Sequence, residues 1–182
     1  DGLSREFKYS AGSIEHIAEL ANRCRPAALA RLHLFQWLIF NVLVGNEDAH
    51  LKNLSFLMSA KGVHLSPFYD LLCTALYGTW ACDSDQWPEQ ATLAWPIHGT
   101  QRLTAITAPL LITAGEAMGI KPTTARDSLR KLVHKVRMEA PKLLDDVMQQ
   151  NEELLAQRPE LGATLAGEVR LLRSINAIVV SE

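Results

Sequence analysis

The sequence lacks a strong excess of charge of either sign. Its 182 residues carry 18 Lys and Arg against 20 Asp and Glu, so the formal net charge is −2, and the sequence pI is about 6.3. Proteins that bind nucleic acid through a broad basic face, or membranes through a polybasic segment, usually have a clear excess of Lys and Arg. The charge balance therefore argues against both classes and leaves room only for a small local basic patch.

Cysteine is scarce, and its spacing matches no metal or disulfide framework. Cys24, Cys73 and Cys82 include no CxxC pair and no Cys/His pair at zinc-finger spacing. An odd number of widely spaced cysteines is typical of reduced thiols in the cytoplasm. The opening residues, "DGLSREFKYS", also lack an initiator methionine and the features of a signal peptide. We therefore expect a cytoplasmic chain that is part of a longer protein.

A long hydrophobic run is absent as well. The most apolar stretch, Leu32 to Val44, is about 13 residues long and is interrupted by His33, Gln36 and Asn41. A membrane-spanning helix needs about 20 apolar residues, so this stretch predicts a buried core helix instead. A length of 182 residues fits a single domain.

Most of the chain has the apolar periodicity of helices. The expected helices are 13–24, 26–44, 104–118, 123–147 and 161–175, with Ser13 and Thr123 or Thr124 as N-caps. Pro141 should kink or break the fourth helix, because proline lacks the N–H and clashes with the preceding turn. Two short apolar stretches, 54–58 and 63–66, predict a β-hairpin, and "PFYDLL" (67–72) predicts a return towards helix. We interpret residues 78–103 as an irregular surface segment with a short strand at "TLAWPI". The predicted class is mainly α (α+β).

The stretch "GNEDAHLKN" (45–53) follows directly on the apolar run and is dense in polar groups. Asp48 and Asn53 lie five residues apart, and Asp70 follows the expected hairpin. This order is typical of a kinase catalytic loop followed by a metal-binding aspartate. Phosphoryl transfer needs an acid that accepts the hydroxyl proton and hard oxygen ligands that hold Mg²⁺. Asp48 suits the first task, and Asn53 and Asp70 suit the second.

His50 and Lys52 complete the expected catalytic loop. His50 follows Asp48 by two residues, as in the lipid-kinase type of loop, so it would orient the loop or contact phosphate. Lys52 could offset developing negative charge, and Glu47 has the character of an ordinary solvated residue.

Other interpretations remain open from the residues alone. Aspartate and asparagine are also common turn and cap residues. A metal-dependent phosphohydrolase or nuclease would use similar side chains. A non-catalytic interaction module could bind a partner through the segment that contains Trp80, Trp87 and Trp95.

These motifs resemble the C-terminal kinase region of the HipA family. The pattern N-x-D-x-H-x-K-N is met by Asn46, Asp48, His50, Lys52 and Asn53, and P-x-Y-D by Pro67, Tyr69 and Asp70. "LAWPIHGTQRLTAIT" is similar to the family's LAM-x-I-x-G-x-x-R-L segment, although Trp95 and Pro96 depart from it. "AGEAMGIKPTTARDSLRKL" resembles the helix pair that follows.

The resemblance implies a bacterial serine/threonine kinase of a toxin–antitoxin module with a phosphatidylinositol-kinase-like fold. Asp48 would be the catalytic base, Asn53 and Asp70 the Mg²⁺ ligands, and ATP the phosphate donor. It implies a target such as an aminoacyl-tRNA synthetase, whose modification arrests growth, and a DNA-binding antitoxin as partner. Residues 1–182 would form one kinase domain, with the catalytic and metal-binding loop at 45–70 and a helical remainder at 104–182. The family's ATP-gripping lobe, with its flexible phosphate-covering loop, is expected to lie outside this chain.

Overall fold

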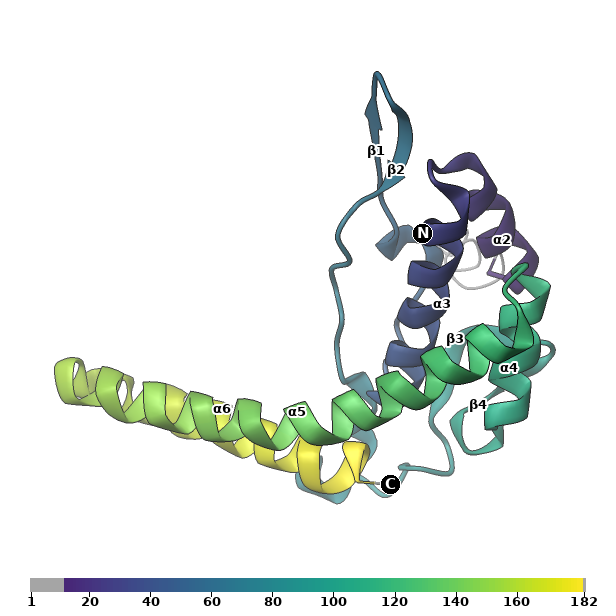
Figure 1. The fold of residues 1–182 in the computed structure, drawn as a ribbon. Coiled ribbons are helices and arrows are strands. Elements are labelled where there is room, and N and C mark those ends of the chain that lie inside the picture. The colour runs from purple at the N-terminus through teal and green to yellow at the C-terminus, as the bar shows by residue number, and fades with distance from the viewer. Residues whose placement is uncertain (1–11, 182) are drawn as a thin grey trace, which may run out of the picture.

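The computed structural model describes residues 12–181, which form helices and two small hairpins (Figure 1). The α-helices are α2 (Ile14–Arg23), α3 (Ala27–Leu43), α4 (Ala108–Ala117), α5 (Pro122–Gln157) and α6 (Gly162–Ser174). The strands are β1 (Phe56–Ser59), β2 (Gly62–Leu65), β3 (Thr92–Ile97) and β4 (Thr100–Arg102). A π-helical stretch, Ile175–Val180, continues α6. The predicted mainly α fold is confirmed.

Helix α3 lies at the centre of the core, as its apolar sequence predicts. Leu34, Phe35 and Ile39 are each 0 % exposed. Helix α2 packs against α3 and buries Ile14 and Ile17, and its N-terminus is capped by the Ser13 hydroxyl, which accepts from the His16 N–H at 3.2 Å. A buried helix of this kind gives the loop that follows it a rigid base.

Both hairpins are antiparallel. In the first, β1 pairs with β2 from Phe56 opposite Leu65 to Ser59 opposite Gly62, which confirms the predicted hairpin with bounds shifted by one or two residues. In the second, β3 pairs with β4 across an irregularity between Thr92 and Ile97.

The short strand predicted at "TLAWPI" is confirmed as β3, but the prediction that residues 78–103 lie at the surface is wrong for this strand. Strand β3 is part of the core, where Leu93, Trp95 and Ile97 are at most 6 % exposed. The alternation of buried and exposed residues is broken at Ala94, which is also buried, so the strand has no clean period of two. Contacts with α4 and α3 residues, rather than local pattern, bury this strand.

Helix α5 runs without interruption from Pro122 to Gln157, with Pro141 inside it, so the expected break does not occur. Helix α6 lies beside α5, and the pair extends away from the core as a helical arm (Figure 1). Packing of α6 along α5 supports the helix despite the missing N–H at Pro141. Thr123 and Thr124 lie within the helix rather than at its cap, because α5 begins at Pro122, a residue suited to a first turn.

The structure agrees with the sequence on membrane-spanning helices. Across residues 12–181, no helix combines the length and the apolar character that crossing a bilayer would require.

Candidate active site

The loop at 45–53 begins at a tightly capped end of α3. The Gly45 N–H donates to the Val42 carbonyl at 3.2 Å, and the Asn46 N–H donates to the Asn41 carbonyl at 2.8 Å. This pair of bonds is the Schellman motif, which needs a left-handed residue after the helix. Gly45 supplies it with φ +60, and an added Cβ would lie 2.6 Å from the Ala75 Cβ. The direction in which the loop leaves the core is therefore set by glycine.

Asn46 lies at the centre of the loop's hydrogen bonds. Its side chain is 0 % exposed. Its Nδ2 donates to Asn41 Oδ1 at 2.7 Å and to the Asp70 carbonyl at 3.1 Å, and its Oδ1 accepts from the Asp48 N–H at 3.1 Å. Asn41 Nδ2 in turn donates to the Trp37 carbonyl at 2.8 Å. One buried amide thus connects α3, the Asp48 loop and the Asp70 segment.

Asp48 and Asn53, which are five residues apart in sequence, are in direct contact. Asn53 Nδ2 donates to the Asp48 carbonyl at 3.2 Å, and that carbonyl also accepts from the His50 N–H at 2.8 Å. The Asp48 side chain is 35 % exposed, whereas Asn53 is buried. The backbone around Asp48 is therefore held while its carboxylate remains accessible to a reactant.

His50 and Lys52 differ sharply in exposure. His50 is 6 % exposed, and its Nε2 lies 3.9 Å from Asp48 Oδ2. Lys52 is exposed, and its carbonyl accepts from the Tyr69 hydroxyl at 3.1 Å. Burial and the contact with Asp48 give His50 the geometry of a group that orients the loop. The Lys52 side chain is exposed, so its positive charge is solvated.

Asp70 has a backbone conformation that the sequence did not predict. Its φ is +57, in the left-handed region that non-glycine residues seldom adopt, although aspartate tolerates it better than most. This turn ends any return to helix, and residues 66–73 are irregular. The bond from Asn46 to the Asp70 carbonyl holds the turn, and Asp70 is exposed.

Two further residues connect the loop to β3, and neither was recognised from the sequence. Glu47, interpreted as solvated, accepts from the Thr92 N–H at its Oε1 at 2.9 Å, and its own N–H donates to Thr74 Oγ1 at 2.7 Å. Trp95 Nε1 donates to the Ala49 carbonyl at 3.0 Å. A tryptophan in an apolar stretch needs a partner for its N–H, and that requirement was the available signal.

The residue types fit a Mg²⁺–nucleotide site. Asn53 donates through Nδ2, and among residues 12–181 no hydrogen bond engages its Oδ1, which is a hard oxygen ligand. That described part of the chain holds no group of three or more His, Cys, Asp or Glu side chains placed to bind a metal. Asparagine and aspartate oxygens are nevertheless ligands of the type that Mg²⁺ accepts, one or two at a time together with substrate phosphates.

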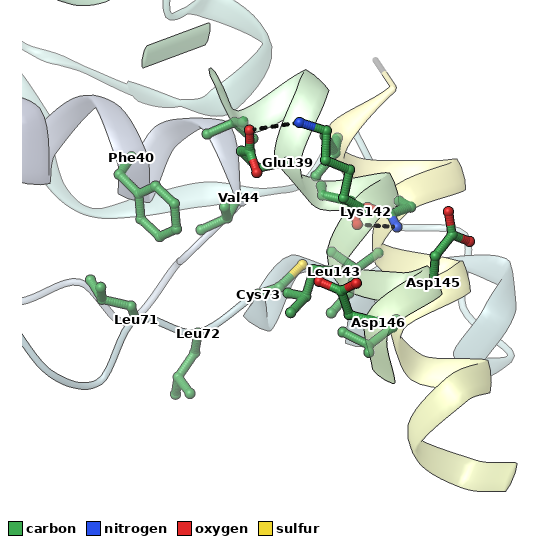
Figure 2. A pocket seen from close by; sticks show the side chains of 16 residues that line it. Phe40, Val44, Leu71, Leu72, Cys73, Glu139, Lys142, Leu143, Asp145 and Asp146 are labelled. Carbon is green, nitrogen blue, oxygen red and sulfur yellow. Dashed lines mark hydrogen bonds and ion pairs between the residues drawn. The ribbon is translucent and has the colours of Figure 1, made fainter. Parts of the chain in front are cut away.

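A separate apolar groove begins just after Asp70. Figure 2 shows it between the end of α3, the segment Leu71–Leu72–Cys73 and the middle of α5. Its volume is about 730 Å³, and its lining includes none of the expected catalytic or metal-binding residues. Burial in this groove raises the pKa of the Cys73 thiol to about 11, against the opposing effect of a backbone hydrogen bond at Leu76. The groove is therefore a neighbour of the candidate site that shares none of its residues.

Comparison with known proteins agrees with the family resemblance of the motifs. The family model described as the HipA-like C-terminal domain matches residues 1–140. The chain belongs to this family. The match contains every candidate site residue and ends near the middle of α5, so the outer part of the helical arm lies beyond it.

Two curated relatives carry the names of kinases. The Serine/threonine-protein kinase toxin HipA of Shewanella oneidensis is 42% identical over 65 residues, which cover 36% of this chain and 15% of the relative. The second relative, from Sinorhizobium fredii, carries a provisional kinase name. It is 41% identical over 81 residues, which cover 42% of this chain and 19% of the relative. The HipA-like family therefore includes kinases.

The fold is similar to that of a solved HipA structure. A chain of the Shewanella oneidensis MR-1 toxin–antitoxin complex of HipA, HipB and operator DNA matches with a TM-score of 0.61 and 25% sequence identity. The match covers 91% of this chain and 34% of that chain. This chain thus spans a minor part of the length of the relatives it matches.

Proposed function

We propose that this chain is the catalytic and metal-binding part of a serine/threonine protein kinase that uses Mg²⁺ and ATP. The observation that carries the proposal is the junction of the two motifs. One Asn46 amide bonds both the Asp48 N–H and the Asp70 carbonyl, and Asn53 bonds the Asp48 carbonyl. Membership of the HipA-like family and the kinase names of two relatives support it.

In the proposed reaction Asp48 acts as the base. It accepts the proton of a serine or threonine hydroxyl while the hydroxyl oxygen bonds the γ-phosphorus and the bond from that phosphorus to ADP breaks. Partial exposure of the Asp48 carboxylate is the property that an approaching hydroxyl requires. The main contribution that a protein can make to this step is to position the reacting groups, and the hydrogen-bonded backbone of Asp48 would position the base.

Asn53 and Asp70 would hold the metal through their side-chain oxygens. Bound Mg²⁺ neutralises charge on the nucleotide phosphates. His50, buried beside Asp48, would keep the base oriented, and exposed Lys52 would offset negative charge at the mouth of the site.

The complete activity is proposed to need a longer protein than this chain, with a separate lobe that grips ATP. The chain spans only 34% of the HipA chain that it resembles, which supports this expectation. We further propose growth arrest through a bacterial target protein, with an aminoacyl-tRNA synthetase as the first to test. The structural neighbour is a complex of HipA with HipB and operator DNA, which supports a DNA-binding antitoxin as partner.

Two alternative functions have less support. A metal-dependent phosphohydrolase or nuclease would need more ligands than the described residues gather in one place. A tryptophan-based interaction module would need a shared surface, but Trp80 is 74 % exposed, Trp95 is 3 % exposed and Trp87 packs against Leu76 and its neighbours.

Substitution of the base tests the proposal. In the full-length protein, Asp48→Ala should reduce transfer of ³²P from γ-labelled ATP to a serine/threonine peptide library by about 10³-fold or more, because no group would accept the hydroxyl proton. Asp70→Ala should raise the Mg²⁺ concentration needed for ATP binding. Exposed Asp85→Ala is the matched control and should leave both measurements unchanged.

Undiminished labelling with Asp48→Ala would refute the assignment of the base. Absence of Mg²⁺-dependent labelling by the wild-type protein would refute the kinase proposal itself. Phosphoproteomics of cells that briefly express wild type or Asp48→Ala would then identify the target, since target phosphosites should appear only with wild type.

A further inference from the structure

Asn46 differs from the other polar residues of the loop because none of its side chain reaches solvent. It is 0 % exposed, whereas the Asp48 and Asp70 side chains are accessible. A buried amide without partners would destabilise the fold, so its hydrogen bonds must be made within the protein. They are made to three different segments of the chain.

The partners of Asn46 require an amide and not merely a polar group. Nδ2 donates twice, to Asn41 Oδ1 and to the Asp70 carbonyl, while Oδ1 accepts from the Asp48 N–H. A carboxylate at this position would turn both donations into repulsions between oxygens. A hydroxyl group is too short and has a single hydrogen to donate. Asparagine alone among side chains of this size satisfies all three contacts.

Asn46 joins the two residues on whose side chains phosphate transfer would depend. The Asp48 N–H belongs to the proposed base, and the Asp70 carbonyl belongs to the proposed metal ligand, 22 residues further along the chain. Asp70 also has the unfavourable φ of +57, which persists only if surrounding contacts hold it. The Asn46 bond is such a contact.

We propose that Asn46 is a positioning residue, which sets the Asp70 metal ligand relative to the Asp48 base. This inference rests on the kinase function proposed above. Asn46 is anchored for this role on both sides, since its N–H closes the end of α3 and its side chain bonds Asn41, which itself bonds the Trp37 carbonyl. Movement of the Asp70 segment would therefore break bonds that reach into the buried helix.

Two substitutions of Asn46 separate positioning from packing. Asn46→Asp keeps the size and the acceptor for the Asp48 N–H but loses both donations, including the bond to Asp70. Asn46→Ser keeps a small neutral group that can be buried without a charge. Asn176→Ala is the matched control, because Asn176 is a partly buried asparagine that donates to the Ala140 carbonyl at 3.0 Å in the helical arm.

The experiment measures ³²P transfer by the full-length protein to one peptide selected from the serine/threonine library, as the Mg²⁺ concentration is varied. Outer-shell residues of metal sites typically affect metal affinity or activity by about 10- to 100-fold. Asn46→Asp should therefore raise the Mg²⁺ concentration for half-maximal rate by about 10-fold and lower kcat by about 10- to 100-fold. The KM for the peptide should stay within about twofold of the wild-type value, since the acceptor does not touch Asn46. Asn176→Ala should match wild type in all three.

The outcomes distinguish this inference from the kinase proposal. If wild type transfers phosphate and a folded Asn46→Asp or Asn46→Ser variant keeps the wild-type Mg²⁺ dependence and kcat, the positioning role is refuted while the kinase function stands. If wild type shows no transfer, the kinase function is refuted first. Should Asn46→Asp fail to fold, judged by circular dichroism, Asn46→Ser decides, because a purely structural role would lower its thermal stability without changing its Mg²⁺ dependence.

Discussion

The reactivity of single side chains in this protein depends more on their burial than on their neighbours in sequence. Cys73 and Cys82 lie nine residues apart in one irregular segment. Cys82 is exposed, whereas Cys73 lines the apolar groove of Figure 2, where burial raises its pKa to about 11. Because the thiolate and not the thiol is the nucleophile, the two cysteines should differ in reactivity.

We predict that iodoacetamide at pH 8 labels Cys82 at least about 10-fold faster than Cys73. With a pKa of about 11, only roughly 0.1% of the Cys73 thiol is ionised at pH 8, and this fraction rises as the pH approaches 11. Peptide mass spectrometry over a time course measures the two rates. Labelling in denaturant is the control and should make the rates similar, and equal rates in the folded protein would contradict the partial burial of Cys73.

The ends of elements decide where the candidate site lies. The loop after helix α3 would leave the helix in another direction if residue 45 could not adopt a left-handed conformation. The Schellman bonds at Gly45 and Asn46 fix this direction, which we call the exit of α3. The Gly45 carbonyl also accepts from the Ala75 N–H at 2.9 Å, so this exit contacts the segment after Asp70. A single helix end thus organises both parts of the site.

We predict that Gly45→Ala lowers the free energy of unfolding by about 2–4 kcal/mol. Two causes add here, namely the strain of φ +60 and the approach of a new Cβ to within 2.6 Å of Ala75 Cβ. Urea denaturation followed by circular dichroism measures the change.

Gly99→Ala provides the matched control for this substitution. Gly99 has φ +81 but no atom within 4 Å of an added Cβ, so only the conformational cost of about 1–2 kcal/mol applies. Equal losses for the two variants would show that the contact with Ala75 relaxes at no cost.

The whole molecule combines a dense core with a sparsely buried arm. The only buried residues of α5 are Ala125, Ser128 and Leu129, close to its start, and α6 has none. Figure 1 shows the outer halves of α5 and α6 extending from the core and packed mainly on each other. Leu143, Leu154 and Leu171 are at least 36 % exposed there. The arm therefore has few contacts that resist local opening.

We predict that backbone amides of residues 145–170 exchange with deuterium about 10- to 100-fold faster than those of α3. Local opening of the arm breaks few buried contacts, whereas opening of α3 disrupts the core. Hydrogen exchange with mass spectrometry measures both, and residues 125–133 of α5 serve as an internal reference because they pack on the core. Protection of the arm equal to that of α3 would contradict this division.

Local pattern was sufficient for the features that depend on neighbours in sequence. The apolar run 32–44 predicted the buried helix, Ser13 predicted a cap, and the first hairpin followed from two short apolar stretches. Local pattern also indicated the strand at 92–97, but it failed for the break expected at Pro141 and for the burial of β3, where packing against other elements overrides local preference. The catalytic roles of Asp48, His50 and Lys52 and the metal-binding roles of Asn53 and Asp70 stay predictions.

By itself, the sequence determined which chemical groups the protein has and in what order, because motif spacing and helical periodicity are properties of neighbouring residues. That was sufficient to indicate the HipA-like family and to single out Asp48, Asn53 and Asp70. Only the tertiary structure decided what Asn46, Glu47 and Trp95 do, since all their side-chain partners but the Asp48 N–H lie between 5 and 46 residues away. Hydrogen bonds over such separations depend on how α3, the loop and β3 pack together, and no local pattern encodes that packing.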